Sequence, residues 1–130
     1  MNIEQLIQEA IEASKNTYSP FSHYSVGAAL LTVEGLVFHG TNIENDSYGL
    51  TICAERSAIF SAVSNGYRHF NEMAVVTKDG GTSCGACRQV IIQFASPDMK
   101  IHFCSVRDNG MIMNIDTFLA RELLFKPFKL

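Results

Sequence analysis

Residues 73–97 read MAVVTKDGGTSCGACRQVIIQFASP, and this stretch indicates how the chain folds. Residues 73–77 form a short apolar run typical of a buried strand, and residues 78–82 form a glycine-rich turn. Apolar residues then recur at helical spacing until the segment stops before Pro97. A strand, a turn and a helix in this order predict a βα unit, which is the building block of α/β folds.

The remainder of the chain adds helices and strands on both sides of this unit. Apolar residues repeat at helical spacing over residues 3–15, and a second helix is predicted to be capped by Thr51 and to run to Gly66 as its C-terminal stop. Apolar segments predict four more strands, at residues 26–33, 36–40, 101–106 and 111–115. Asp116 is expected to cap a last short helix that reaches Leu124. The alternating order predicts an α/β sandwich with a mixed sheet, in a single domain over residues 1–130.

The composition excludes several classes of protein. Of 130 residues, 47% are hydrophobic and 18% are charged, which excludes disorder caused by low hydrophobicity. The net charge is −3, with no basic run, so nucleic acid is a poor candidate ligand and a small molecule is favoured. No apolar run approaches the length of a membrane span, and the acidic N-terminus does not resemble a secretory signal. We therefore expect no membrane partner and a cytoplasmic location.

Four cysteines provide the strongest functional signal. Cys84 and Cys87 form a C-x-x-C motif at the start of a predicted helix, where the helix dipole favours thiolates. Alone, this motif is ambiguous between a zinc site and a redox dithiol. Cys53 stands at the start of the other internal helix, two residues before Glu55. Three thiolates suit a zinc ion that keeps one coordination position for water, with Glu55 as the base beside it. Cys104 lies in a predicted strand, and we expect it to be a buried residue that only packs in the core.

The pattern C-x-E followed by S-C-x-x-C is a close variant of the zinc deaminase signature, H-x-E followed by P-C-x-x-C. The chain resembles the small homotetrameric cytidine deaminases along most of its length. The matching stretches are TYSPFSHYSVGAALL, FHGTNIENDSYGLTICAERSAIFSAV and CGACRQV, with a weaker match at ELLFKPF. The resemblance implies a three-layer α/β/α sandwich with a five-stranded mixed sheet. It also implies a hydrolase of cyclic amidine C–N bonds that deaminates cytidine and deoxycytidine in pyrimidine salvage.

The resemblance also implies roles for individual residues around the metal. Cys53, Cys84 and Cys87 would bind one Zn²⁺ per subunit, and Glu55 would move protons between water and the pyrimidine. Three thiolates and one Zn²⁺ carry a net charge of −1, which weakens the metal as a Lewis acid. Arg56 would offset this charge through hydrogen bonds to the sulfur atoms, and Arg88 is a second candidate.

The resemblance also implies which residues of this chain contact the substrate. Asn42 and Glu44 match the family's ribose-binding pair, Phe21 matches an aromatic residue near the base, and backbone at Ala54 would contact the pyrimidine edge. Tyr48 and Phe128 match residues that reach into a neighbouring subunit's site. The resemblance therefore predicts a homotetramer with shared active sites and a nucleoside substrate.

This sequence departs from the family pattern at three positions. Ser83 and Ser25 stand where proline is usual, and Phe125 replaces the usual proline after the leucine pair, which weakens the alignment of Phe128. We expect Ser83 to give a looser or differently hydrogen-bonded site that still binds the metal.

Four alternative functions are considered. Within the class, the substrate would be another cytosine-bearing small molecule, such as blasticidin S. From another class, the chain would be a non-catalytic zinc-stabilised module or a redox dithiol protein. A polynucleotide-editing deaminase is disfavoured by the negative charge.

Overall fold

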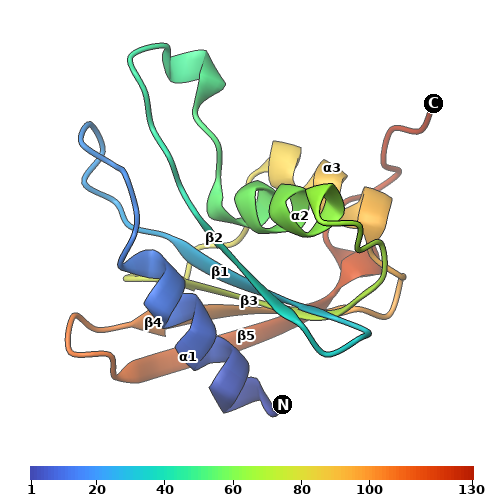
Figure 1. The fold of residues 1–130 in the computed structure, drawn as a ribbon, viewed down its shortest axis with the longest axis horizontal. Helices are drawn as coiled ribbons and strands as arrows, with labels where there is room; N and C mark the ends of the chain where they lie inside the picture. Colours follow the sequence, from blue (N-terminus) through green and yellow to red (C-terminus); the bar gives the residue numbers. More distant parts are fainter.

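The computed structural model describes residues 1–130, in which three α-helices accompany five strands (Figure 1). The helices are α1 (Ile3–Ser14), α2 (Ala54–Ser64) and α3 (Gly85–Phe94). The strands are β1 (Gly27–Thr32), β2 (Val37–Thr41), β3 (Phe70–Thr77), β4 (Lys100–Val106) and β5 (Ile112–Leu119). Two short 3₁₀ turns span Tyr48–Leu50 and Ala120–Glu122. None of the helices is both long and apolar enough to cross a membrane.

The strands form one mixed sheet in the order β2-β1-β3-β4-β5. Only β3 and β4 run parallel, and the connection between them is the predicted βα unit, with α3 as the crossover helix. The other neighbouring strands are antiparallel. This arrangement confirms the mixed five-stranded sheet.

Helices cover the sheet on both faces, with α1 on one face and α2 and α3 on the other (Figure 1). Strand β1 is buried along its whole length, because alternate side chains enter two different cores. Leu30 packs in the core beneath α2 and α3, whereas Leu31 packs in the core beneath α1. The three-layer sandwich is therefore confirmed.

Two glycines let the helices approach the sheet closely. A Cβ on Gly27 would lie 2.1 Å from the carbonyl oxygen of Ala10 in α1. A Cβ on Gly40 would lie 2.2 Å from the carbonyl oxygen of Ala54, the first residue of α2. No side chain fits at either position. The start of α2 therefore contacts β2 directly, and this contact fixes the distance between α2 and the sheet.

The predicted last helix is wrong. Residues 116–119 continue β5, and the chain then makes only the 3₁₀ turn Ala120–Glu122. Asp116 lies opposite Phe103 of β4 in the antiparallel ladder, so it is a strand residue and caps no helix. Strand β5 is an exposed edge strand, and polar residues there resemble a helix start when only the sequence is read.

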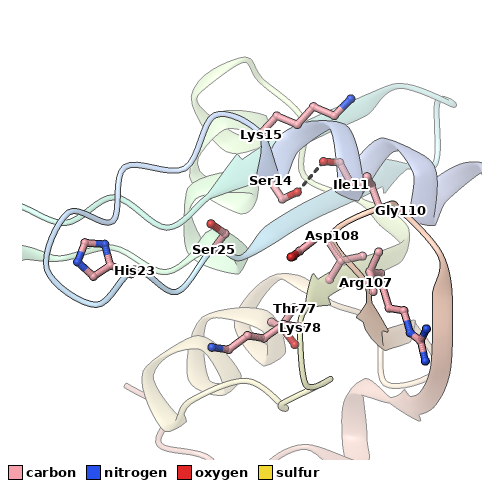
Figure 2. Close-up of a pocket in the computed structure, with 12 residues that line it drawn as sticks. Ile11, Ser14, Lys15, His23, Ser25, Thr77, Lys78, Arg107, Asp108 and Gly110 are labelled. Carbon is pink, nitrogen blue, oxygen red and sulfur yellow. Dashed lines mark hydrogen bonds between the residues drawn. The ribbon is translucent and has the colours of Figure 1, made fainter.

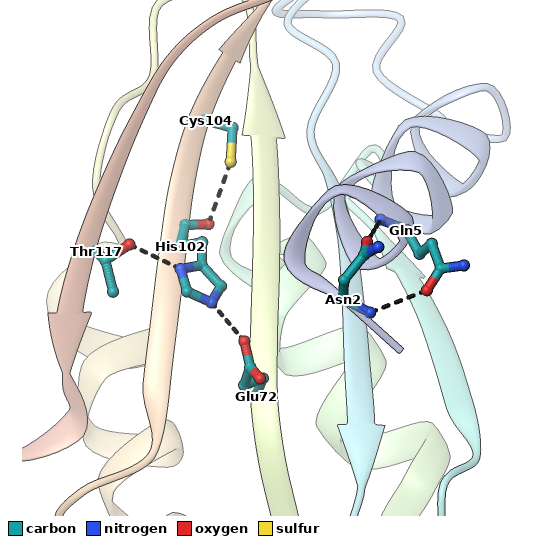
Figure 3. A network of polar contacts seen from close by, with 6 residues as sticks. All are labelled: Asn2, Gln5, Glu72, His102, Cys104 and Thr117. Carbon is teal, nitrogen blue, oxygen red and sulfur yellow. Dashed lines mark hydrogen bonds and ion pairs between the residues drawn. The ribbon is translucent and has the colours of Figure 1, made fainter.

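Two polar networks away from Cys53, Cys84 and Cys87 are structural (Figure 3). Asn2 and Gln5 form a capping box at the start of α1. Buried His102 has both ring nitrogens engaged, with Nε2 2.6 Å from Glu72 Oε2 and Nδ1 2.8 Å from Thr117 Oγ1. His102 therefore ties three neighbouring strands together and offers no free nitrogen to a metal.

Candidate active site

Three cysteines meet where two helices begin. Cys53 is the N-cap residue of α2, Cys84 is the N-cap residue of α3, and Cys87 lies in the first turn of α3. Their sulfur atoms all lie within 4.8 Å of one another, and those of Cys53 and Cys84 are 3.8 Å apart. The structure thus brings together the three residues that the sequence selected.

This donor set fits a tetrahedral zinc ion. Zinc–sulfur bonds of about 2.3 Å in a tetrahedral site place two bound sulfurs about 3.8 Å apart, which is the separation found between Cys53 and Cys84. Thiolates are preferred zinc ligands, and both helix N-termini favour negative charge at this point. No other group of three histidine, cysteine or acidic side chains converges in this way.

The thiols differ in acidity. Hydrogen bonds from Cys87 and from Arg56 lower the pKa of Cys53 to about 5, whereas the bond to Cys53 and burial raise the pKa of Cys87. The Nη2 of Arg56 lies 3.3 Å from the Cys53 sulfur and donates to it. The site therefore stabilises at least one thiolate through the protein alone.

Glu55 lies beside the cysteines in the first turn of α2 and is only 5% exposed. Burial raises the pKa of its carboxyl, because charge is costly away from water. The hydroxyl of Ser83 donates to Glu55 Oε2 at 2.6 Å and opposes that shift. A raised pKa makes this carboxyl take up a proton more readily than an exposed glutamate does, which suits a group that must both accept and release protons.

A cavity of about 420 Å³ opens in front of these residues. Cys53, Cys84, Ala54 and Glu55 line one side of it. The other lining residues come from β3 itself and from the loops before β1 and after β2, β3 and η1, and include Ser22, Tyr24, Asn42, Glu44 and Thr77. The volume is in the range of small-ligand pockets.

Asn42 and Glu44 line the cavity and also brace its wall. The Asn42 side chain accepts hydrogen bonds from Thr17 and from the Val26 N–H, and it donates to the Tyr24 carbonyl. One Nδ2 hydrogen of Asn42 stays available for a ligand. The Glu44 carboxylate accepts from the N–H groups of residues 21 and 22 and from the Ser22 hydroxyl, which lowers its pKa.

The aromatic candidates lie outside the cavity lining. The rings of Phe21 and Tyr48 pack edge to face with centroids 5.2 Å apart, and Tyr48 is 70% exposed. Phe128 is 69% exposed, and its backbone exchanges two hydrogen bonds with the Gln89 side chain on α3. Tyr48 and Phe128 thus present their rings outward.

Arg88 braces the loop that carries Cys84. Its guanidinium donates to the Ser83 carbonyl, to the Thr82 hydroxyl and to the Leu123 carbonyl. These contacts join the start of α3 to the C-terminal segment. Of the two arginines considered for contacts to sulfur, Arg56 is the one that makes such a contact.

The sequence did not single out Ser22 and Tyr24 as lining residues. The Tyr24 hydroxyl donates to Asp79 at 2.5 Å and so links the loop before β1 to the loop after β3. Both residues lie in the quoted stretch TYSPFSHYSVGAALL, but no spacing rule predicts which side chains of a loop turn inward.

A second cavity, of about 310 Å³, lies at the α1 side of the sheet (Figure 2). Lys15, Lys78 and Arg107 lie around it, but their charged ends point away from one another (Figure 2). Because no set of donors converges there, this cavity is a poorer candidate site than the one beside the cysteines.

Comparisons with known proteins agree with this geometry. Residues 1–103 match the family model described as the cytidine and deoxycytidylate deaminase zinc-binding region. A cytidine deaminase from Halalkalibacterium halodurans is 50% identical over 121 residues, which cover 92% of each chain. A cytidine deaminase from Sporosarcina psychrophila is 46% identical over 109 residues, covering 82% of this chain and 80% of that protein.

A solved structure shows the same fold. The crystal structure of a cytidine deaminase from Burkholderia pseudomallei superposes with a TM-score of 0.90 at 42% sequence identity. The match covers 98% of this chain and 100% of the other.

Proposed function

The chain belongs to the cytidine and deoxycytidylate deaminase family, and we infer that it hydrolyses cytidine and deoxycytidine to uridine and deoxyuridine with release of ammonia. The observation that carries this inference is the cluster of Cys53, Cys84 and Cys87 beside a cavity that Cys53, Cys84 and Glu55 line. The whole chain is proposed to act as one domain, which the single five-stranded sheet supports.

The three cysteines would hold one Zn²⁺ per chain. When bound, this ion supplies a Lewis acid that makes water nucleophilic at neutral pH. Arg56 donates a hydrogen bond to the Cys53 sulfur. This bond withdraws negative charge from a site in which three thiolates and one Zn²⁺ would carry a net charge of −1. Arg88 acts on the backbone, because it holds the loop of Ser83 in place.

Glu55 is the proposed catalytic acid and base. Its carboxylate takes a proton from water and delivers it to the pyrimidine N3, so that charge does not accumulate on the ring as C4 is attacked. The carboxylate then takes the proton of the new C4 hydroxyl and passes it to the departing amino group, so that ammonia leaves as the C4 carbonyl forms and the carboxylate is regenerated. Burial supports this cycle, because it raises the pKa of the carboxyl and so eases each uptake of a proton.

The remaining contacts would orient the nucleoside. Asn42 and Glu44 line the cavity and offer one amide hydrogen and carboxylate lone pairs, which suit a ribose 3′-hydroxyl and do not require a 2′-hydroxyl. Ala54 lies at the cavity wall, where its backbone can meet the pyrimidine edge. Phe21, whose N–H donates to Glu44 Oε1 at 2.9 Å, is the aromatic residue proposed to lie near the base.

The active protein is proposed to be a homotetramer with shared sites. Tyr48 and Phe128 expose large rings that do not line their own chain's cavity, which supports their use by a neighbouring copy. We place the protein in the cytoplasm, because zinc-binding thiols persist in reducing surroundings, and we assign it to pyrimidine salvage.

A substrate panel tests the activity. Ammonia release is measured with cytidine, deoxycytidine, cytosine, CMP and blasticidin S, and zinc is quantified on the same sample. We expect turnover of the two nucleosides and one zinc per chain. Turnover of blasticidin S alone would move the assignment to that substrate, and ammonia from none of the five would overturn it.

The Glu55→Gln variant tests the catalytic residue. Glutamine keeps the size of the side chain but cannot carry the proton, so deamination should fall by about 10²- to 10⁴-fold while zinc stays bound. The exposed Glu4→Gln, in the first turn of α1, is the matched control. A non-catalytic zinc module would show no activity to lose, and a redox protein would form a reversible disulfide between Cys84 and Cys87 without stoichiometric zinc.

A further inference from the structure

Ser83 makes a contact that the family's usual residue at this position cannot make. Its hydroxyl lies 2.6 Å from Glu55 Oε2, and both residues are only 5% exposed. Proline, which the resemblance predicts here, has no side-chain donor. The contact is therefore a feature of this chain and is not implied by membership of the family.

The position of the Ser83 hydroxyl is fixed by its surroundings. Ser83 directly precedes Cys84, the N-cap residue of α3, so its backbone is tied to the start of that helix. The Arg88 Nε donates to the Ser83 carbonyl at 2.8 Å, and its Nη2 donates to Thr82 Oγ1 at 2.9 Å. A hydroxyl on a braced backbone can hold its partner in one orientation.

The contact acts on one of the two carboxylate oxygens of Glu55. Ser83 supplies the only side-chain hydrogen bond to this carboxylate, and that bond goes to Oε2. Oε1 has no side-chain partner, and Glu55 lines the cavity. A hydroxyl is both donor and acceptor, so the bond can persist whether Glu55 is ionised or carries a proton.

We propose that Ser83 is a positioning residue for Glu55, which holds Oε2 so that Oε1 faces the reacting pyrimidine. The proposal rests on the proposed deaminase function. Its physical basis is that proton transfer requires heavy atoms within hydrogen-bond reach, and a misplacement of about 1 Å can cost 10²-fold in rate.

The test compares Ser83→Ala with Ser83→Thr, which keeps the hydroxyl. We expect Ser83→Ala to lower kcat for cytidine by about 10- to 100-fold with little change in KM, the range for loss of a hydrogen bond to a charged group. Ser83→Thr should keep kcat within about threefold of the original chain. Ser83→Gly is a second hydroxyl-free variant in case Ser83→Ala does not fold, and Ser64→Ala, on the exposed end of α2, is the matched control.

Two further measurements separate positioning from a merely structural role. Zinc content and thermal midpoint should stay unchanged in Ser83→Ala. The affinity for a nucleoside analogue with a hydroxyl on a tetrahedral C4 should fall in parallel with kcat, while the affinity for uridine, with its planar C4, should not change.

The results of these experiments distinguish a failure of the proposed deaminase function from a failure of the proposed role of Ser83. If the original chain releases no ammonia from any nucleoside, the proposed function fails. If the original chain is active and Ser83→Ala retains its kcat, or loses zinc together with activity, the positioning role of Ser83 is overturned.

Discussion

Arg56 donates a hydrogen bond to the sulfur of Cys53 across 3.3 Å, one helical turn from that cysteine. The guanidinium therefore stabilises the thiolate form, and the pKa of Cys53 is lowered to about 5 by its hydrogen bonds to Cys87 and Arg56. A site of three thiolates depends on such a donor, because metal binding competes with protonation of the sulfurs.

Arg56→Gln should weaken both metal binding and catalysis. Loss of the donated charge raises the thiol pKa of Cys53, so protons displace zinc at a higher pH than in the original chain. We expect kcat to fall about tenfold at neutral pH. Zinc retention across a pH series measures the first effect. Arg68→Gln, in the exposed loop between α2 and β3, is the control, and equal retention in both variants would contradict the prediction.

Gly40→Ala should displace the start of α2. The added Cβ would lie 2.2 Å from the Ala54 carbonyl oxygen and 2.4 Å from the Ala58 nitrogen, and backbone atoms cannot yield as a flexible side chain would. Overpacking of this kind costs about 1–3 kcal/mol of stability. Because Cys53 and Glu55 lie at that helix end, zinc affinity should fall as well. Gly49→Ala, which meets no atom within 4 Å, should leave denaturant unfolding unchanged.

Cys104 should stay unreactive when the metal is removed. The side chain is fully buried beneath α1, and burial raises its thiol pKa to about 12. After chelation of zinc, a thiol reagent at pH 8 should modify Cys53 and the exposed Cys84 in the native protein. It should not modify Cys104 or Cys87, because both side chains are buried with a raised thiol pKa and only an accessible thiolate reacts. All four should react in denaturant, as mass spectrometry can show. Early labelling of Cys104 in the native state would contradict this expectation.

Much of the fold could be predicted because the informative residues act locally. The spacing of apolar residues in α1 and the turn glycines around β3 are signals within a single element. The edge strand β5 was cut short in the prediction because its polar residues Asp116 and Thr117 are explained only by their partners in the preceding strand, β4. Element boundaries that depend on a neighbouring strand are not encoded in the element itself.

The candidate site likewise contains features that the sequence predicts and contacts that it does not. Cys53, Glu55 and the C-x-x-C pair were found because metal ligation and helix starts impose spacing. The contact between Ser83 and Glu55 joins residues 28 positions apart, and nothing in either segment specifies it. The Arg88 contacts with backbone carbonyls could not be predicted either. Every residue has a backbone carbonyl, so the sequence does not mark which one accepts the hydrogen bond.

The Glu44 carboxyl should titrate below its ordinary range. The Ser22 hydroxyl and the N–H groups of residues 21 and 22 favour the carboxylate and lower its pKa. Because the folded-state pKa is depressed, these bonds stabilise the loop fully above the ordinary value of 4.5 and are lost as pH falls through the lower folded value. Carboxyl carbon NMR should show the lowered midpoint. Ser22→Ala should move it upward and Ser64→Ala should not, and a midpoint unaffected by Ser22→Ala would contradict the assignment.

Shared active sites should allow two inactive variants to restore each other. Phe128→Ala should impair a neighbouring site while leaving its own Glu55 intact, and Glu55→Gln has the opposite defect. In hybrid tetramers formed by co-expression at equal levels, about one site in four combines an intact Glu55 with an intact Phe128 from another chain. Deamination should therefore rise well above that of either variant alone. The purified variants mixed without subunit exchange are the control. Activity no greater than the sum of the two variants, or full activity of a monomer in sedimentation at low concentration, would show that each chain completes its own site.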